Sequence, residues 1–174
     1  MDIALIEPEI PGNTGSIGRV CVGTGCALHL VGKLGFDISE RAVRRAGLDY
    51  WKDVDLVVAP DRHAWEASVA GRKLWLFSTQ GARRYDEVAY GPDDILVFGC
   101  ETRGLPADVV ARYPDQIVYL PMTNKIRSLN LANTVTAALY EALRQQEFAG
   151  ITSPQAGAAE SGHAGDAGEP TTKG

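Results

Sequence analysis

The sequence predicts an α/β fold with a mostly parallel sheet flanked by helices. Short apolar runs bounded by glycine, proline or aspartate alternate along the chain with segments of helical periodicity. Strands that are buried on both faces are continuously apolar, so runs of this kind favour a parallel sheet. Strands that alternate with helices indicate that each helix carries the chain back to begin the next parallel strand.

The expected elements follow one another from the amino terminus. The strands are residues 3–6, 28–31, 56–58, 74–77, 95–98 and 117–120, and the helices are residues 14–24, 39–46, 62–70, 106–112 and 128–147. The last helix is the clearest, because Leu131, Val135, Leu139 and Leu143 recur at every fourth position and form one apolar face. We expect Ser128 to cap this helix, since a serine hydroxyl accepts hydrogen bonds from the free amides of a first turn.

Composition narrows the class of protein. The chain has 174 residues, 45% of them hydrophobic, which is enough for one globular domain with a sizeable core. No apolar run reaches the roughly 18 residues of a membrane-spanning helix, and the first residues lack the basic leader of a signal peptide. Three cysteines without a C-x-x-C pair favour reduced thiols and argue against a zinc site. We therefore expect a cytoplasmic protein with no membrane partner and no metal.

Charge and composition also differ along the chain. The net charge of −5 gives no general attraction to nucleic acid, so RNA binding would have to use local basic patches. The folded domain is expected to cover residues 1–148. Residues 149–174 are rich in alanine and glycine and have too little apolar bulk to offset their ordering entropy. We expect them to form a disordered tail without a chemical role.

Three polar segments follow predicted strands, at the edge of the sheet where open α/β folds bind their ligands. They are residues 7–19, 99–106 and 126–133. The third contains an arginine, a serine and two asparagines at the start of a predicted helix, although asparagine is unfavourable inside helices. These segments are the candidate ligand site.

Several common sites do not fit these segments. Glycines 12, 15 and 18 are spaced G-x-x-G-x-x-G, whereas dinucleotide-binding folds need G-x-G-x-x-G, so a nicotinamide oxidoreductase is a disfavoured alternative. The glycine-bounded segment 99–104 continues without the Lys-Ser/Thr of a phosphate-binding loop. There is no G-x-S-x-G nucleophile motif, and His29 and His63 lie where histidine is usually structural.

The remaining polar side chains offer hydrogen-bond donors but no obvious nucleophile. They are Arg19, Glu101, Arg103, Arg127, Ser128 and Asn130. Such a set suits group transfer to a substrate that brings its own hydroxyl.

Four ordered motifs resemble those of the small α/β-knot (SPOUT) methyltransferases. They are Glu-Pro-Glu-Ile-Pro-x-Asn-Thr-Gly-x-Ile-x-Arg (7–19), Arg-Arg-Ala-Gly-Leu-Asp-Tyr (44–50), Phe-Gly-x-Glu-Thr-Arg-Gly-Leu-Pro (98–106), and Leu-Pro-Met with Arg-Ser-Leu-Asn-Leu-Ala-Asn (120–133). The second motif favours the TrmL class, which methylates the ribose of the tRNA wobble nucleotide. The resemblance covers residues 1–148, and Gly12 and Cys100 depart from it at positions where proline is usual.

The resemblance implies a deep carboxy-terminal trefoil knot, a homodimer and S-adenosylmethionine as the methyl donor. A sulfonium donor needs no metal. The residues expected at the cofactor, largely through backbone atoms, are Phe77, Gly99, Leu120 and Ser128, with Glu101, Gly104 and Met122 as neighbours.

The resemblance further implies 2′-O-methylation of cytidine or uridine 34 in the anticodon loop of tRNA. Arg19 would activate the hydroxyl, either as a base or by stabilising the developing negative charge. Asn13, Ser128 and Asn130 would position the site, and Arg44, Arg45 and Tyr140 would contact the RNA. The alternatives are methylation of another tRNA or rRNA nucleotide and a non-catalytic knotted RNA-binding protein.

Overall fold

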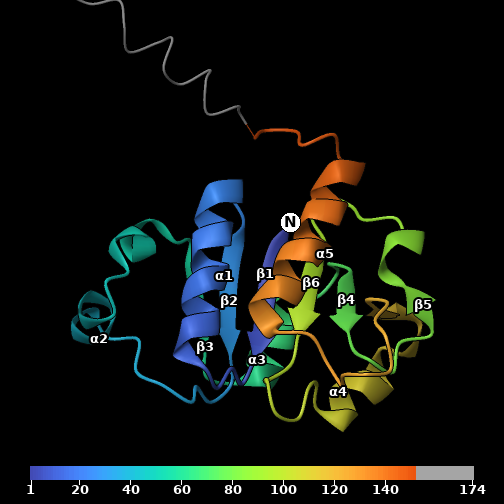
Figure 1. Ribbon diagram of the computed structural model, residues 1–174, viewed down its shortest axis with the longest axis horizontal. Coiled ribbons are helices and arrows are strands. Elements are labelled where there is room, and N and C mark those ends of the chain that lie inside the picture. The colour runs from blue at the N-terminus through green and yellow to red at the C-terminus, as the bar shows by residue number, and fades with distance from the viewer. Residues whose placement is uncertain (152–174) are drawn as a thin grey trace, which may run out of the picture.

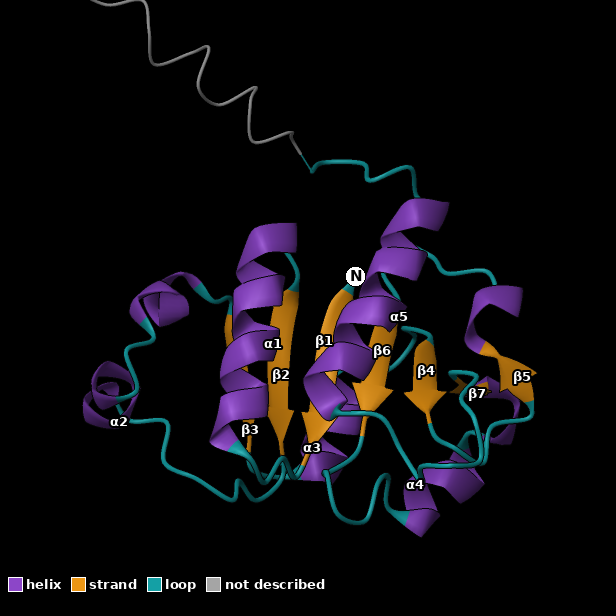
Figure 2. Cartoon of the chain, in the orientation of Figure 1, coloured by secondary structure: helices purple, strands orange, loops and turns teal. Residues whose placement is uncertain are grey.

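The computed structural model describes residues 1–151, which form a seven-stranded parallel sheet with helices on both faces (Figures 1 and 2). The strands lie in the order β3-β2-β1-β6-β4-β7-β5, and each neighbouring pair is parallel. Their bounds are β1 (Asp2–Ile6), β2 (Ala27–Val31), β3 (Leu56–Ala59), β4 (Leu74–Phe77), β5 (Arg83–Arg84), β6 (Ile95–Phe98) and β7 (Ile117–Tyr119). The predicted α/β class and parallel sheet are confirmed.

The predicted helices are all present, with shifted ends. Their bounds are α1 (Pro11–Thr24), α2 (Glu40–Arg45), α3 (Arg62–Ser68), α4 (Ala107–Arg112) and α5 (Leu131–Gln145), with 3-10 helices η1 (Asp49–Asp53), η2 (Tyr85–Glu87) and η3 (Pro114–Gln116). Strand β5 and the 3-10 helices were not predicted, because segments of two to five residues are too short to carry a periodic signal.

Helix α1 begins earlier than expected, at Pro11. Proline suits the first helical position, where its fixed φ is already helical and its missing N–H would have no helical partner. The helix ends at Thr24 and is capped by Gly25, whose φ of 70° is left-handed and whose amide donates to the carbonyl of Cys21.

Helix α5 begins later than expected, and the prediction that Ser128 caps it is wrong. The capping residue is Asn130, whose side-chain oxygen accepts from the amide of Asn133 at 3.2 Å. A cap must directly precede the first helical residue, and Ser128 lies two residues ahead of that position, in the loop.

Two apolar layers hold the helices on the sheet. Alternate residues of β1 point to opposite faces, so Ile3 and Leu5 join one layer while Ala4 and Ile6 join the other. The first layer contains side chains of α1 and α5, and the second contains Trp65 of α3 and a valine of α4. In Figures 1 and 2, α1 and α5 accordingly lie together in front of the sheet.

The chain from β7 to α5 runs from one edge of the sheet back to its middle. Strand β7 lies near one edge, between β4 and β5, and the following loop returns to place α5 over β6 beside α1 (Figure 1). The trefoil knot that the resemblance implies stays a prediction. Ile151, the last described residue, packs against the first apolar layer, and the rest of the predicted tail, 152–174, lies outside the described residues. None of the helices within residues 1–151 is long and apolar enough to cross a membrane.

Candidate functional site

A cavity of about 880 Å³ opens at the carboxyl ends of β4, β6 and β7. Its walls come from the loops after these three strands, from one face of α4 and from the starts of α1 and α5. Cavities of this size at this edge of a parallel sheet are typical ligand sites. The three polar segments identified in the sequence therefore meet at one place, joined by the loop Ser78–Thr79–Gln80, which the sequence analysis did not single out.

The floor of the cavity is apolar. Phe77 stacks on Phe98 with ring centroids 4.5 Å apart, and Leu120 and Met122 line the wall nearby. Flat, apolar surface of this kind can cover the faces of an aromatic base and keep water away from it.

The loop after β6 closes on itself. The amide of Gly104 donates to the carbonyl of Cys100 at 2.9 Å, and Gly104 has a left-handed φ of 72° that favours glycine. A Cβ at Gly99 would lie 2.0 Å from the carbonyl carbon of Gly104, so only glycine fits there. The loop's own backbone thus already requires glycine at position 99, whatever ligand the cavity holds.

Glu101 connects this loop to the start of α1. Its carboxylate accepts from the amides of Glu9 (2.8 Å) and Ile10 (3.2 Å) and from the side-chain amide of Asn13 (2.9 Å). Helix α1 has no side-chain cap of its own, and a carboxylate at a helix amino terminus is favourable. Glu101 therefore fixes the first turn of α1 against the cavity.

The same network continues into α5. The side-chain oxygen of Asn13, a buried residue, accepts from the side-chain amide of Asn130 at 3.0 Å. Asn130 in turn caps α5 through the amide of Asn133. One continuous chain of hydrogen bonds thus aligns the ends of α1 and α5 at the cavity.

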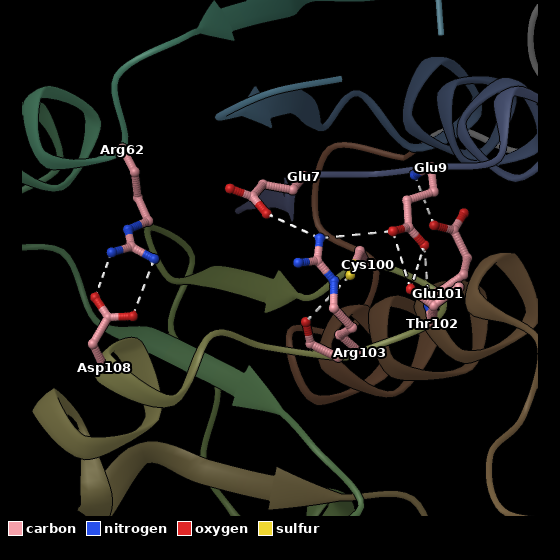
Figure 3. Close-up of polar contacts among 9 residues, drawn as sticks. Glu7, Glu9, Arg62, Cys100, Glu101, Thr102, Arg103 and Asp108 are labelled. Carbon is pink, nitrogen blue, oxygen red and sulfur yellow. Dashed lines mark hydrogen bonds and ion pairs between the residues drawn. The ribbon is translucent and has the colours of Figure 1, made fainter. Parts of the chain in front are cut away.

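A second polar cluster ties the outer part of the same loops together (Figure 3). Arg103 lies between the carboxylates of Glu7 and Glu9, at 3.4 and 3.7 Å. Thr102 donates to the Glu9 carboxylate from its amide (3.2 Å) and its hydroxyl (2.7 Å). The sequence did not indicate the Glu9–Thr102 contact, since the two residues are far apart along the chain. A separate ion pair in Figure 3, Arg62 with Asp108, joins α3 to α4.

The structure gathers most of the predicted site residues around the cavity. All seven expected cofactor residues line it, namely Phe77, Gly99, Glu101, Gly104, Leu120, Met122 and Ser128. Asn13 and Asn130 line it as well.

The remaining predicted residues lie elsewhere on the surface. Arg19 is on α1, within the expected helix 14–24, and 69% of its side chain is exposed. Arg44 and Arg45 are exposed in the last turn of α2, and Tyr140 is half exposed on α5. One set of predicted residues is therefore assembled at the cavity, and the other is spread over exposed helices.

His29 and Cys21 have structural surroundings. His29 is buried, accepts from the indole N–H of Trp65 at 3.0 Å, and lies 3.4 Å from the Asp2 carboxylate. Burial raises the pKa of the Cys21 thiol to about 12, which makes it inert at neutral pH. Within residues 1–151 there is no group of three or more His, Cys, Asp or Glu side chains placed to hold a metal ion.

Comparison with known proteins adds independent findings. Residues 1–140 match the model of the SpoU rRNA Methylase family. The tRNA (cytidine(34)-2′-O)-methyltransferase of Methylovorus glucosotrophus is 45% identical over 150 residues, which cover 86% of this chain and 97% of that protein. The corresponding enzyme of Burkholderia ambifaria is 46% identical over 155 residues, with the same coverage.

Solved structures agree with this relationship. One that concerns the 2-OH methylation of C/U34 on tRNA has a TM-score of 0.78 at 40% identity, over 84% of this chain and 95% of that one. The SpoU methyltransferase AviRb of Streptomyces viridochromogenes, in complex with the cofactor AdoMet, has a TM-score of 0.69 at 27% identity, over 84% of this chain and 60% of that one. With a family model that spans its cavity loops and relatives that match nearly end to end, this chain belongs to the SpoU family of RNA methyltransferases.

Proposed function

We propose that this chain transfers a methyl group from S-adenosylmethionine to the ribose 2′-hydroxyl of cytidine 34 in tRNA, or of uridine 34 where a tRNA carries it. The observation that carries the proposal is the meeting of all the predicted cofactor loops at one cavity. The relatives that are about 45% identical to this chain and named for cytidine 34 support the choice of substrate.

The cavity fits S-adenosylmethionine in size and chemistry. About 880 Å³ accommodates a nucleoside with a short amino-acid arm. Phe77 and Leu120 would cover the base, and the backbone of the loop that begins at Gly99 would supply hydrogen bonds at its edge. The Ser128 hydroxyl, close to the start of α5, would serve a polar group of the ligand.

The reaction needs an acceptor oxygen placed in line with the methyl group, and it releases one proton. When bound, S-adenosylmethionine supplies a methyl group that is already activated by the positive sulfur, so the ribose oxygen forms the new bond as the methyl–sulfur bond breaks. Asn13 and Asn130, held by Glu101 and by each other, would orient the ribose at the cavity mouth. The apolar floor would exclude water, a competing acceptor.

Arg19 would act on the hydroxyl, as a base or by stabilising the developing alkoxide. It lies on the exposed side of α1, outside the residues that line the cavity. Within our proposal a homodimer resolves this separation, because a second copy that packs on α1 and α5 can bring its own Arg19 to this cavity. The exposed apolar side chains Val22 and Tyr140 support these two helices as the interface.

Recognition of tRNA would use exposed basic residues rather than net charge. Helix α2 has no buried residue and presents Arg44 and Arg45 in its last turn. A chain with a net charge of −5 needs such a local patch to attract phosphates. Tyr140 would contact the RNA at the border of the dimer interface.

The test is single-turnover methylation of a tRNA anticodon stem-loop by the Arg19→Ala variant. We expect the methyl-transfer rate to fall roughly a hundredfold, as for loss of one transition-state hydrogen-bond donor, while calorimetry shows unchanged S-adenosylmethionine affinity. Arg19→Lys is the matched control for charge, and it should restore little because an ammonium lacks the planar fork of guanidinium. A near wild-type rate for Arg19→Ala would remove this residue from the mechanism.

The same assay separates the alternatives. A stem-loop with 2′-deoxycytidine at position 34 should accept no methyl group. Methylation of that RNA would indicate another target nucleotide, and RNA binding without transfer by the wild-type protein would indicate a non-catalytic binder. Sedimentation of a stable monomer with full activity would contradict the dimer.

A further inference from the structure

The surroundings of Arg19 are unusually defined for an exposed side chain. Its guanidinium carbon lies 4.3 Å from the centre of the Tyr50 ring. Its terminal nitrogen lies 4.0 Å from the carboxylate of Asp49, which is 90% exposed. Both partners belong to η1 and close the Arg-Arg-Ala-Gly-Leu-Asp-Tyr motif, whose last two residues the proposed function does not use.

The Tyr50 ring is held in place by α1 itself. Its hydroxyl donates to the carbonyl of Gly15 at 2.8 Å, one turn before Arg19 on the same helix. A Cβ at Gly15 would lie 3.3 Å from Leu48, and a Cβ at Gly18 would lie 2.7 Å from the Trp51 ring. Because Gly15 and Gly18 have no side chains, the η1 segment can lie directly against this face of α1.

The two contacts of Arg19 differ in strength. An ion pair between two exposed groups at 4.0 Å is screened by water and contributes little. A guanidinium over the face of a fixed ring gains cation–π attraction and loses side-chain freedom before substrate arrives. A guanidinium that lies with its flat face on a ring keeps its in-plane N–H groups available to a hydroxyl or a phosphate.

We propose that Tyr50 is a positioning residue for methyl transfer, which acts by holding the Arg19 guanidinium on its ring. The inference rests on the proposed role of Arg19 and extends it to Tyr50, which is not among the residues that line the cavity. The advantage is preorganisation. Without Tyr50, the long, exposed Arg19 side chain would have to lose its conformational freedom on the way to the transition state.

The experiment compares two Tyr50 variants in wild-type and Arg19→Ala backgrounds. Tyr50→Met removes the ring but keeps apolar bulk, and we expect it to lower the single-turnover rate about tenfold, the scale of a misplaced catalytic group. Tyr50→Phe keeps the ring and loses the bond to Gly15, and we expect it to keep most of the rate. In the Arg19→Ala background, Tyr50→Met should cause no further loss, because its effect passes through Arg19.

Controls distinguish positioning from general damage. Calorimetric affinity for S-adenosylmethionine and the thermal midpoint should be close to wild type in Tyr50→Phe. Trp51→Leu, which loosens η1 at Gly18 without touching Arg19, should lower the thermal midpoint more than the rate. If Tyr50→Met does not fold, Tyr50→Gln replaces it with the same expectations.

Each remaining outcome decides between the claims. Equal losses in Tyr50→Phe and Tyr50→Met, or a further loss in the double variant, would overturn the inference in favour of a structural role for Tyr50. A slow Arg19→Ala with a wild-type Tyr50→Met would overturn the inference alone. A wild-type rate in Arg19→Ala would overturn the proposed function of Arg19 and the inference with it.

Discussion

The two ends of the parallel sheet both bury polar side chains, but they use them differently. At the amino end, Asp94 accepts from the indole of Trp75 at 2.8 Å and from the amide of Gly91 at 2.9 Å. At the carboxyl end, Asn13 and Glu101 make a similar number of bonds beside a large cavity. A buried polar group is therefore not a functional signal by itself, and its position relative to the cavity decides its role.

The partners of these groups explain the difference. At the amino end they are the indole of the buried Trp75 on β4 and the amide of Gly91 in the turn before β6, so the bonds hold a strand and a neighbouring turn together. At the carboxyl end the partners are loops and helix termini that surround the cavity. We expect changes at the amino end to cost stability alone and changes at the carboxyl end to alter binding.

The largest expected effect at the amino end is that of Asp94→Ala. The variant leaves two donors without an acceptor, one of them the indole of the buried Trp75. We expect a loss of about 3 kcal/mol in the free energy of unfolding, measured in urea, since an unsatisfied buried donor carries its full desolvation cost. Calorimetric affinity for S-adenosylmethionine should not change at a temperature where the variant is folded.

Asp93→Ala is the matched control for that experiment, since Asp93 is the exposed neighbour. It should leave the free energy of unfolding within about 0.5 kcal/mol of wild type. A clear loss of cofactor affinity in folded Asp94→Ala would contradict the division between the two ends.

Much of this architecture could be predicted from the sequence. The apolar runs located β1, β2, β3, β4, β6 and β7 to within two residues, because a strand buried on both faces leaves a continuous pattern. The three candidate segments meet at one cavity, as expected, since parallel strands place their carboxyl ends at one edge. The strand order and β5 could not be predicted, because both depend on contacts between segments far apart along the chain.

A smaller effect at the amino end depends on pH. Burial alone would raise the pKa of Asp2, but hydrogen bonds from His29 and Arg72 outweigh it and hold the pKa well below its ordinary value of 3.8. A depressed carboxyl pKa contributes stability above the unfolded value and loses it as pH falls through the folded one. We therefore expect the free energy of unfolding to decrease below about pH 4, where the unfolded carboxyl begins to bind its proton.

Asp2→Asn tests this assignment. The variant should be less stable than wild type at pH 7 and should show a shallower decrease between pH 5 and about pH 2, because the linked proton is gone. Urea unfolding across this range is the measurement, with Asp93→Asn as the exposed control. An unchanged acid slope in Asp2→Asn would assign the pH dependence to other carboxylates.

The candidate site was less predictable than the fold. Motif resemblance identified the cavity residues, yet it could not separate those that hold the loops from those that face a ligand. Glu101 is an example. It was expected beside the cofactor, which stays a prediction, and the structure shows that its carboxylate holds the start of α1. The contact of Arg19 with Tyr50 could not be predicted, because it depends on how η1 packs on α1.

The smallest expected effects distinguish two neighbours at the carboxyl end, Ser128 and Asn130. Asn130→Ala removes the cap of α5 and the bond to Asn13, and should cost about 1 kcal/mol of stability. Ser128→Ala removes a hydroxyl that lines the cavity without capping the helix, so its stability should stay within about 0.5 kcal/mol of wild type. The affinity of Ser128→Ala for S-adenosylmethionine should fall about fivefold, the worth of one neutral hydrogen bond.

Thermal unfolding measures the stability of both variants, and calorimetry measures their affinity for S-adenosylmethionine. Equal destabilisation by the two changes would return the capping role to Ser128, and unchanged affinity in Ser128→Ala would remove its hydroxyl from the cofactor site.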